Sequence, residues 1–371
     1  MRMPLRGHAI WFALVAALST SCAARPDAGA PPLRGIYGGV PQEILDRGTR
    51  LRDFGVDAVW LGAGSFTPER LALLRAEGVQ VYAEFNTLHV ADYLEAHPDA
   101  APIGPDGRVS PPPQGWQGIC PTHDEYRRFR MDAYRKLLQD FAIDGVWLDY
   151  HHSHASWERA EPDMPDTCFC DRCLRRFQNA TAIRLPDAPT PERAQILLTT
   201  HREAWVRWRL DVFTDWVREF RAIIDTTRPS ALLGTFHNAW SDEDMDGARL
   251  EKLAIDLKAH AAYVDVFSPM VYHARFGYAD DAAWISRQVT WLGEYLGIGG
   301  SPGERHRIWP IVQISDWGQP VPVEQVASVL DHGRRRPATG VMVFAWGGLR
   351  KQPEKIEAIG RAFRAMDAAG R

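Results

Sequence analysis

Acidic residues stand at the ends of several apolar runs in this chain. The run 144–150, DGVWLDY, places Asp149 directly after apolar and aromatic positions, where a carboxylate is costly unless it is paired. Glu84 and Asp316 end two other apolar runs, and Glu158 lies in the polar segment that follows Asp149. Two carboxyl groups that flank one bond can act as the general acid and as the base or nucleophile of its hydrolysis. The sequence therefore predicts Asp149 as one catalytic residue and Asp316, Glu84 or Glu158 as its partner.

Three histidines open the segment that follows Asp149, namely His151, His152 and His154. A catalytic metal bound by them is one interpretation, and it corresponds to a metal-dependent deacetylase. Histidines beside a carboxylate at a strand end more often bind substrate, which is the interpretation that we favour. Together with Tyr150, His151 and His152 can also donate hydrogen bonds that keep Asp149 ionised, as suits a nucleophile or a base. The partner carboxyl group would then be the protonated acid.

Three cysteines close the same segment with the spacing C-x-C-x-x-C: Cys168, Cys170 and Cys173. A fourth, Cys120, precedes a predicted helix at 124–141. A turning loop with this spacing can place three sulfurs around one ion, and the fourth thiolate would complete a closed tetrahedral zinc site. Such a site has no open coordination position, so the predicted zinc is structural. The alternative is a pair of disulfides formed in an oxidising compartment.

Eight short apolar, β-branched or aromatic runs alternate with longer amphipathic stretches. The runs are residues 34–39, 57–64, 79–85, 144–150, 231–239, 264–273, 306–315 and 339–348. Eight strand–helix repeats predict an α/β fold, a single (β/α)8 TIM barrel with long loops after strands three and four. A doubly wound sheet with a helical insertion is the alternative. Asp57, Asp144 and Asp265 begin runs, so we expect them at the end of the barrel opposite the active site, in stabilising roles.

Active sites of such barrels lie where the strands end, and aromatic residues and polar donors at that place can bind a substrate. The predicted substrate-binding residues at this mouth are Tyr37, His151, His152, His237, Asn238, Tyr272, Trp317 and Trp346. Trp205, Trp208 and Trp216 instead follow helical spacing, which is typical of core positions. The net charge of −4 includes no long run of one sign, so nothing points to nucleic acid as a partner.

The N-terminal residues differ from the rest of the chain. Arg2 and Arg6 precede an apolar run at 9–18 that is too short to span a bilayer, a pattern typical of a secretory signal. Small residues before Cys22 indicate a bacterial lipoprotein signal, in which Cys22 is acylated. The predicted organisation is a signal peptide at 1–21, a Pro/Ala/Gly tether at 22–33 and a barrel at 34–371. We expect an exported protein, lipid-anchored to the outer membrane or otherwise periplasmic or secreted.

Several motifs resemble glycoside hydrolase barrels. CPTHDEYRRF (120–129), DGVWLDY (144–150) and CFCDRCLRRF (168–177) are similar to segments of the family 42 beta-galactosidases and of the uncharacterised glycosyl-hydrolase-like families near them. SPMVY (268–272) and MVFAWGG (342–348) also look like such barrels. The resemblance implies that Cys120, Cys168, Cys170 and Cys173 bind zinc.

The catalytic positions depart from that family. Family 42 enzymes end strand four in Asn-Glu and strand seven in Glu, whereas this chain has Leu148-Asp149 and Asp316 at those places. Galactosidase specificity therefore does not follow. We expect a glycoside hydrolase that acts on an oligo- or polysaccharide. A catalytically inactive carbohydrate-binding barrel and a metal-dependent polysaccharide deacetylase are the alternatives.

Overall fold

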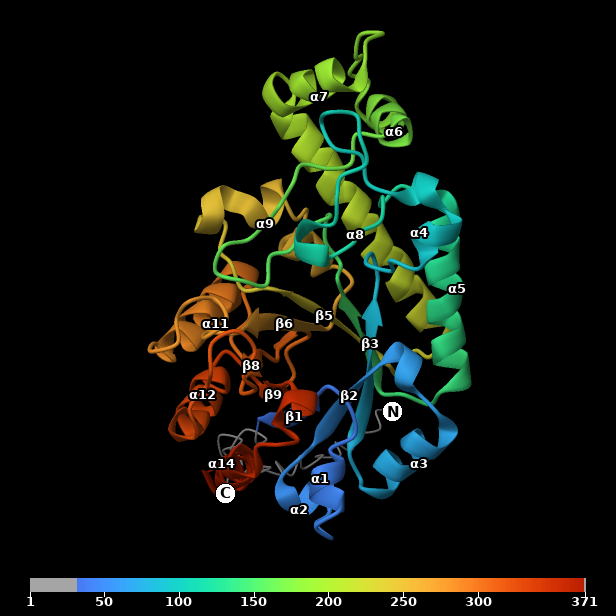
Figure 1. Cartoon of the computed structure of the whole chain (residues 1–371). Coiled ribbons are helices and arrows are strands. Elements are labelled where there is room, and N and C mark those ends of the chain that lie inside the picture. The colour runs from blue at the N-terminus through green and yellow to red at the C-terminus, as the bar shows by residue number, and fades with distance from the viewer. Residues whose placement is uncertain (1–31, 370–371) are drawn as a thin grey trace, which may run out of the picture.

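The computed structural model describes residues 32–369, and within them the strands form one closed, parallel sheet (Figure 1). The strands are β1 (Leu33–Tyr37), β2 (Ala58–Gly62), β3 (Gln80–Asn86), β4 (Gly145–Asp149), β5 (Leu232–Asn238), β6 (Val266–Val271), β7 (Arg307–Ile308), β8 (Ile311–Gln313) and β9 (Gly340–Phe344). β7 and β8 are two pieces of one barrel strand, interrupted at Trp309 and Pro310, because proline has no N–H to donate. The sheet closes where β9 pairs with β1. The predicted (β/α)8 barrel is confirmed.

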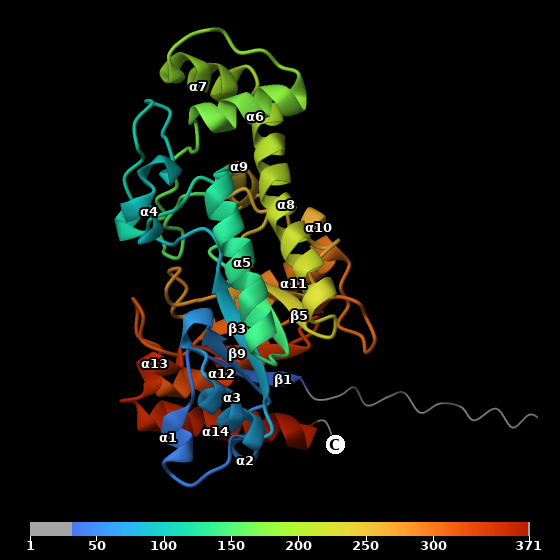
Figure 2. The ribbon, with the colours of Figure 1, turned by 90° about the vertical axis from the view of Figure 1, so that its right-hand side faces the viewer.

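Helices surround the sheet. Those that follow the strands are α1 (Gln42–Leu45), α2 (Leu51–Phe54), α3 (Pro68–Ala76), α5 (Asp124–Asp140), α8 (Arg202–Thr227), α9 (Ala248–Glu251), α10 (Leu257–His260), α11 (Ala283–Leu296), α12 (Val326–Gly333), α13 (Trp346–Leu349) and α14 (Pro353–Ala369). Helix α4 (Tyr93–Ala96) lies in the segment between β3 and α5, and α6 (Asp171–Thr181) and α7 (Thr190–Thr199) lie between β4 and α8. Figures 1 and 2 show α6 and α7 standing apart from the barrel, at the far end of the long helix α8.

Large aromatic side chains fill the interior of the barrel. Trp147 of β4 stacks on Trp309, with ring centroids 5.7 Å apart, and it meets Trp60 edge-on at 5.2 Å. Room for these rings requires a glycine on the next strand, since a Cβ atom on Gly234 would lie 2.1 Å from Trp147. The Trp147 indole N–H donates to the Ser268 hydroxyl at 2.9 Å, so its polar atom is satisfied. The barrel interior is therefore a packed core and not a pore.

Acidic residues at the starts of the strands stabilise the opposite end of the barrel from the mouth. Each carboxylate accepts a backbone N–H from a neighbouring strand: Asp57 from Arg34, Asp144 from Val81 and Asp265 from Leu233. Each also forms an ion pair with an arginine: Asp57 with Arg34, Asp144 with Arg75 and Asp265 with Arg221. The expectation that these three acids have stabilising roles is confirmed.

A second, smaller hydrophobic core lies around the insertion after β4. Its buried members are Cys120, Cys168, Phe169, Cys173, Leu174, Phe177, Ala194, Leu197, Trp205 and Trp208. Further along α8, Trp216 packs in the barrel core instead, so this one helix belongs to both cores. The three tryptophans are core residues, as their spacing predicts.

No helix among residues 32–369 has the length and apolar character that a membrane span requires. The predicted signal peptide, the predicted acylation site Cys22 and most of the predicted tether lie outside the described residues.

Candidate active site

A cavity of about 300 Å³ opens at the mouth of the barrel. Its lining residues are Tyr37, Trp116, Asp149, Tyr150, Glu158, Phe236, Met270, Tyr272, Ile311, Trp317, Phe344 and Ala345. One wall is a series of rings in contact, with Tyr37 stacked on Phe344 at 5.5 Å and Phe344 against Tyr272 at 4.5 Å. Two carboxyl groups thus share a largely aromatic pocket, which is the composition expected of a sugar site.

Asp149 ends β4 inside this pocket and is 6% exposed. Its Oδ1 accepts the backbone N–H of Tyr150 at 2.8 Å. Tyr150 has a φ of 49°, in the left-handed region that non-glycine residues seldom adopt. Burial raises the pKa of Asp149 well above its usual range, and the nearby charges of Glu84 and Glu158 raise it further. Asp149 therefore holds its proton more strongly than an ordinary aspartate.

Glu158 reaches the same cavity from the segment after β4. Burial, with a smaller contribution from Glu84, raises the pKa of Glu158 to about 7, while Arg275 opposes the shift. The Arg275 Nε donates to the main-chain oxygen of Glu158 at 2.7 Å, and its guanidinium lies over the Trp317 ring at 4.4 Å. Arg275 thus holds the Glu158 backbone beside the pocket.

Glu84, on β3, is the third carboxyl group of the set. Burial raises its pKa, although the Tyr37 hydroxyl donates to its Oε2 at 3.1 Å and so favours the ionised form. The structure therefore brings together three of the predicted catalytic acids, Glu84, Asp149 and Glu158, in one electrostatically coupled group.

Asp316 lies outside this group. Its Oδ1 accepts from the Lys355 ammonium at 2.7 Å and from the backbone N–H of Val321 at 2.8 Å. Its Oδ2 accepts from Gln352 at 2.9 Å. Burial acts to raise the Asp316 pKa, but the contacts with Lys355, Val321 and Gln352 outweigh burial and lower it. Asp316 connects the end of the seventh barrel strand to α14, and it is not among the residues that line the cavity.

The three histidines after β4 are buried and hydrogen-bonded to other parts of the chain. Burial lowers the pKa of His151 and His152 to about 4, so both are neutral at physiological pH. Their partners are the carbonyl of Phe213 for His151, the carbonyl of Ser153 for His152, and the carbonyl of Pro111 and the N–H of Gly118 for His154. The expectation that His151 and His152 keep Asp149 ionised was wrong, because they bind backbone groups and the pKa of Asp149 is raised.

The other predicted substrate-binding residues divide into two sets. Tyr37, Tyr272 and Trp317 line the cavity. His237 and Asn238 are buried and do not line it, and the indole of Trp346 is turned to the Glu43 carboxylate at 2.6 Å. Trp116, which the sequence analysis missed, is 38% exposed and packs on the Tyr150 ring with centroids 5.2 Å apart. Its place in a Pro/Gly-rich segment between β3 and α5 is the signal that could have found it, because such loops border the mouth.

The four cysteines Cys120, Cys168, Cys170 and Cys173 converge on one point. Their sulfur atoms all lie within 4.8 Å of one another, and none of the four forms a disulfide. The Cys120 sulfur is 3.7 Å from that of Cys170 and 3.6 Å from that of Cys173. Four sulfurs around a zinc ion, with bonds of about 2.3 Å, are about 3.8 Å apart. The cluster therefore fits a closed tetrahedral metal site. Among residues 32–369 it is the one group of three or more His, Cys, Asp or Glu side chains with this convergence, so the histidines form no such site.

Comparisons with known proteins agree on the fold. No protein-family model and no curated protein matches the chain. Among solved structures, the PgaB (BpsB) glycoside hydrolase domain from Bordetella bronchiseptica matches with a TM-score of 0.65 at 16% identity, over 90% of this chain and 99% of that one. A beta-galactosidase from Marinomonas ef1 matches with a TM-score of 0.63 at 13% identity, over 90% of this chain and 59% of that one. A GH42 beta-galactosidase from G. stearothermophilus matches with a TM-score of 0.60 at 14% identity, over 92% of this chain and 57% of that one. The chain thus has the barrel fold of these glycoside hydrolases.

Proposed function

We propose that this protein is a glycoside hydrolase that cleaves an oligo- or polysaccharide with a pair of carboxyl groups. The observation that carries the proposal is the group of Glu84, Asp149 and Glu158 around one aromatic cavity, where burial and mutual repulsion raise the pKa of the two acids that line it. Perturbed carboxyl groups in a pocket are typical of glycosidases, which need one protonated and one ionised acid at neutral pH.

The neighbours of the two acids suggest a division of roles. Asp149, where burial and the charges of both Glu84 and Glu158 raise the pKa well above its usual range, is the general acid that protonates the oxygen of the leaving sugar. Glu158, with a pKa of about 7, is the group that works ionised, either as nucleophile or as the base that activates water. Glu84 adds negative charge that raises the pKa of both. The aromatic wall of Tyr37, Phe344 and Tyr272 then stacks on the sugar rings.

The four-cysteine cluster is the proposed site of a structural zinc ion. Tetrahedral thiolate coordination leaves no position for substrate, so the metal would brace the segments that frame the mouth and take no part in the reaction. Those segments are tied to the cluster by sequence: Cys120 lies between β3 and α5, and Cys168 follows the segment that carries Glu158.

The proposed location is the cell envelope, with Cys22 acylated and the barrel held at the outer membrane. The supporting pattern is the apolar run at 9–18 followed by small residues and Cys22. A Cys22→Ser variant should move from the membrane fraction to the soluble fraction. Wild-type protein recovered without acyl chains and free of the membrane would contradict this location.

A screen of purified protein against aryl glycosides and polysaccharides tests the activity. The best substrate is then used to compare Asp149→Asn and Glu158→Gln with Asp316→Asn, a matched control in which the carboxyl group is engaged by Lys355. We expect loss of turnover in the first two variants and retention in the control. Binding of oligosaccharides without turnover by any form would instead indicate a carbohydrate-binding barrel.

A further inference from the structure

A hollow of about 420 Å³ lies at the end of the barrel opposite the cavity that contains Asp149. Leu33 of β1, Arg307 of β7 and Thr339, just before β9, line it, and these residues stand where their strands begin. Pro32 lines it as well. The described chain thus enters the barrel at this hollow, on the face that points away from the mouth.

The hollow carries arginines that the rest of the described chain does not neutralise. Arg307, Arg334 and Arg336 line it, with Glu304 as the one acid. Arg334 is paired with Asp331, but Arg307 and Arg336 form no ion pair within residues 32–369. Glu304 already accepts the backbone N–H groups of Gly299 and Gly300, at 3.1 and 2.9 Å. The hollow therefore has an excess of positive charge.

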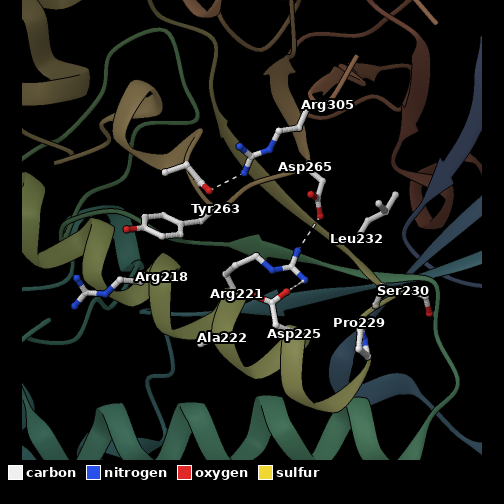
Figure 3. Close-up of a pocket in the computed structure, with 12 residues that line it drawn as sticks. Arg218, Arg221, Ala222, Asp225, Pro229, Ser230, Leu232, Tyr263, Asp265 and Arg305 are labelled. Carbon is white, nitrogen blue, oxygen red and sulfur yellow. Dashed lines mark hydrogen bonds and ion pairs between the residues drawn. The ribbon is translucent and has the colours of Figure 1, made fainter. Parts of the chain in front are cut away.

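A second hollow at this end, of about 580 Å³, contains both an arginine with acidic partners and one without (Figure 3). There Arg221 lies between two carboxylates, with ion pairs of 2.7 Å to Asp225 and 3.0 Å to Asp265. Arg305, at the top of the view, donates to the carbonyl of Ala262 at 2.8 Å and has no acid partner in the part of the chain that the structure describes. Arg305 therefore extends the positive charge of the first hollow towards the second.

The predicted acylation site lies close to this face in sequence. Cys22 precedes Pro32 by ten positions, which span at most about 36 Å when fully extended. A lipid attached to Cys22 would keep Pro32, just before β1, within that distance of the membrane surface, and Arg307 and Arg336 line the same hollow as Pro32. Arginine side chains near an anionic lipid surface are attracted to its headgroups.

We propose that the face formed by Arg305, Arg307 and Arg336, the arginine face, docks on the anionic phospholipid headgroups of the membrane and turns the mouth of the barrel away from the bilayer. The proposal rests on the proposed lipid anchor for its setting and does not depend on the hydrolase activity. The lipid holds the chain near the bilayer, and contacts of a basic patch with anionic headgroups would set which face of the barrel lies against it.

Flotation with vesicles tests the arginine face directly. The full chain carrying Cys22→Ser, so that no acyl chain contributes, is mixed with phosphatidylcholine vesicles that contain either no phosphatidylglycerol or about one third of it. The readout is the ratio of the two affinities, compared between variants, because the apolar run at 9–18 and the basic Arg2 and Arg6 are the same in all of them. We expect a clear preference for anionic vesicles that disappears at about 1 M salt.

Replacing Arg305, Arg307 and Arg336 together with Gln should lower the anionic preference roughly a hundredfold, since each arginine near the surface contributes roughly fivefold. The single variant Arg336→Gln, at an exposed side chain, should lower it roughly fivefold. The matched control replaces Arg108, Arg175 and Arg184 with Gln, three exposed arginines of the α6–α7 side that form no ion pair in the described chain. It should leave the preference within about twofold.

Three outcomes would overturn the proposal: no preference for anionic vesicles, an unchanged preference in the arginine-face variants, or an equal loss in the control. Each is measured without acylation and without substrate. A failure here is therefore distinct from a failure of the proposed anchor, which cell fractionation tests, and of the proposed hydrolase, which the glycoside screen tests.

Discussion

Two buried clusters of ionisable side chains lie close together in sequence and are built in opposite ways. The cysteine cluster, Cys120 with Cys168, Cys170 and Cys173, directs four sulfurs at one point inside the smaller hydrophobic core. The carboxyl cluster consists of Glu84, Asp149 and Glu158. These carboxyl groups do not converge on one shared position, and they repel one another beside an open cavity. Groups that can share one ion stabilise a structure, whereas groups that raise one another's pKa beside a cavity are prepared for proton transfer.

The two clusters also differ in how far the hydrophobic core around each depends on it for stability. The barrel core has a closed sheet and a large set of buried apolar side chains, so it does not depend on the carboxyl cluster. The smaller core has ten buried residues, and three of them are cysteines of the cluster. Units this small usually need a metal or disulfides to remain folded. The cysteine cluster should therefore control local stability, and the carboxyl cluster should control activity.

The largest expected effect is that of removing the metal. Structural zinc contributes on the order of 10–16 kcal/mol of binding free energy, and in this chain most of it would order the smaller core. Cys120→Ser, or a strong chelator, should abolish hydrogen-exchange protection in α6 and α7 and leave the strands of the barrel protected. Metal analysis should give about one zinc per wild-type chain. Cys22→Ser is the control, since that cysteine is not in the cluster. Unchanged protection of α6 and α7 after complete metal removal would show that the cysteine cluster does not control local stability.

Asp149→Asn should reduce activity and leave stability unchanged, in contrast to removal of the metal. We expect kcat to fall by about 10²–10⁴-fold, the usual contribution of a general acid, with an unchanged metal content. The melting temperature should stay nearly unchanged, because Asp149 with its raised pKa is protonated and uncharged, and the amide has almost the same size and shape. The loss should be smaller on aryl glycosides with good leaving groups, which need little protonation. A large fall in melting temperature would show that Asp149 stabilises the barrel, contrary to the comparison.

Glu158 should make both activity and stability depend on pH. Its folded-state pKa of about 7 lies above its ordinary value of 4.5, so the folded state binds this proton more tightly than the unfolded state. The contribution of Glu158 to stability is therefore present below about pH 4.5 and is lost as the pH rises through about 7. Over the same range kcat/KM should rise, as Glu158 becomes ionised. Glu158→Gln should make the stability profile less steep between these values, as measured by denaturant unfolding, while the raised pKa values of Asp149 and Glu84 leave a residual slope. An unaltered profile in this variant would remove Glu158 from the coupled group.

The smallest expected effect concerns the rim of the cavity. Trp116 is partly exposed, lines the cavity and packs on Tyr150, so it offers a platform for a sugar ring. Trp116→Ala should raise KM about tenfold, as loss of one stacking contact of about 1.4 kcal/mol predicts, with little change in kcat. Phe129→Ala is the matched control, because Phe129 is an exposed aromatic on α5 that does not line the cavity. Equal effects of the two substitutions would argue against a sugar platform at Trp116.

Local sequence determined the barrel and much of both clusters. Apolar runs and helical stretches are short-range patterns, so the eight barrel strands could be predicted from them, and the spacing of Cys168, Cys170 and Cys173 already implied a common ligand. Asp149 could be found because an acid at the end of a buried strand has no folding reason to be there. The sequence could not exclude Asp316 from the carboxyl cluster, since the residue that binds its carboxylate, Lys355, lies in α14 and is distant in sequence.

The tertiary structure alone decided the protonation states and the roles of the histidines. Tyr150 has a positive φ, which turns the chain after Asp149. The side chains of His151 and His152 then hydrogen-bond to the backbone carbonyls of Phe213 and Ser153 and not to Asp149. The pKa of Asp149 depends on how completely water is excluded and on charges from β3 and from the segment that carries Glu158. Both quantities are sums over neighbours that come from separate parts of the chain, and so no local pattern of residues encodes them.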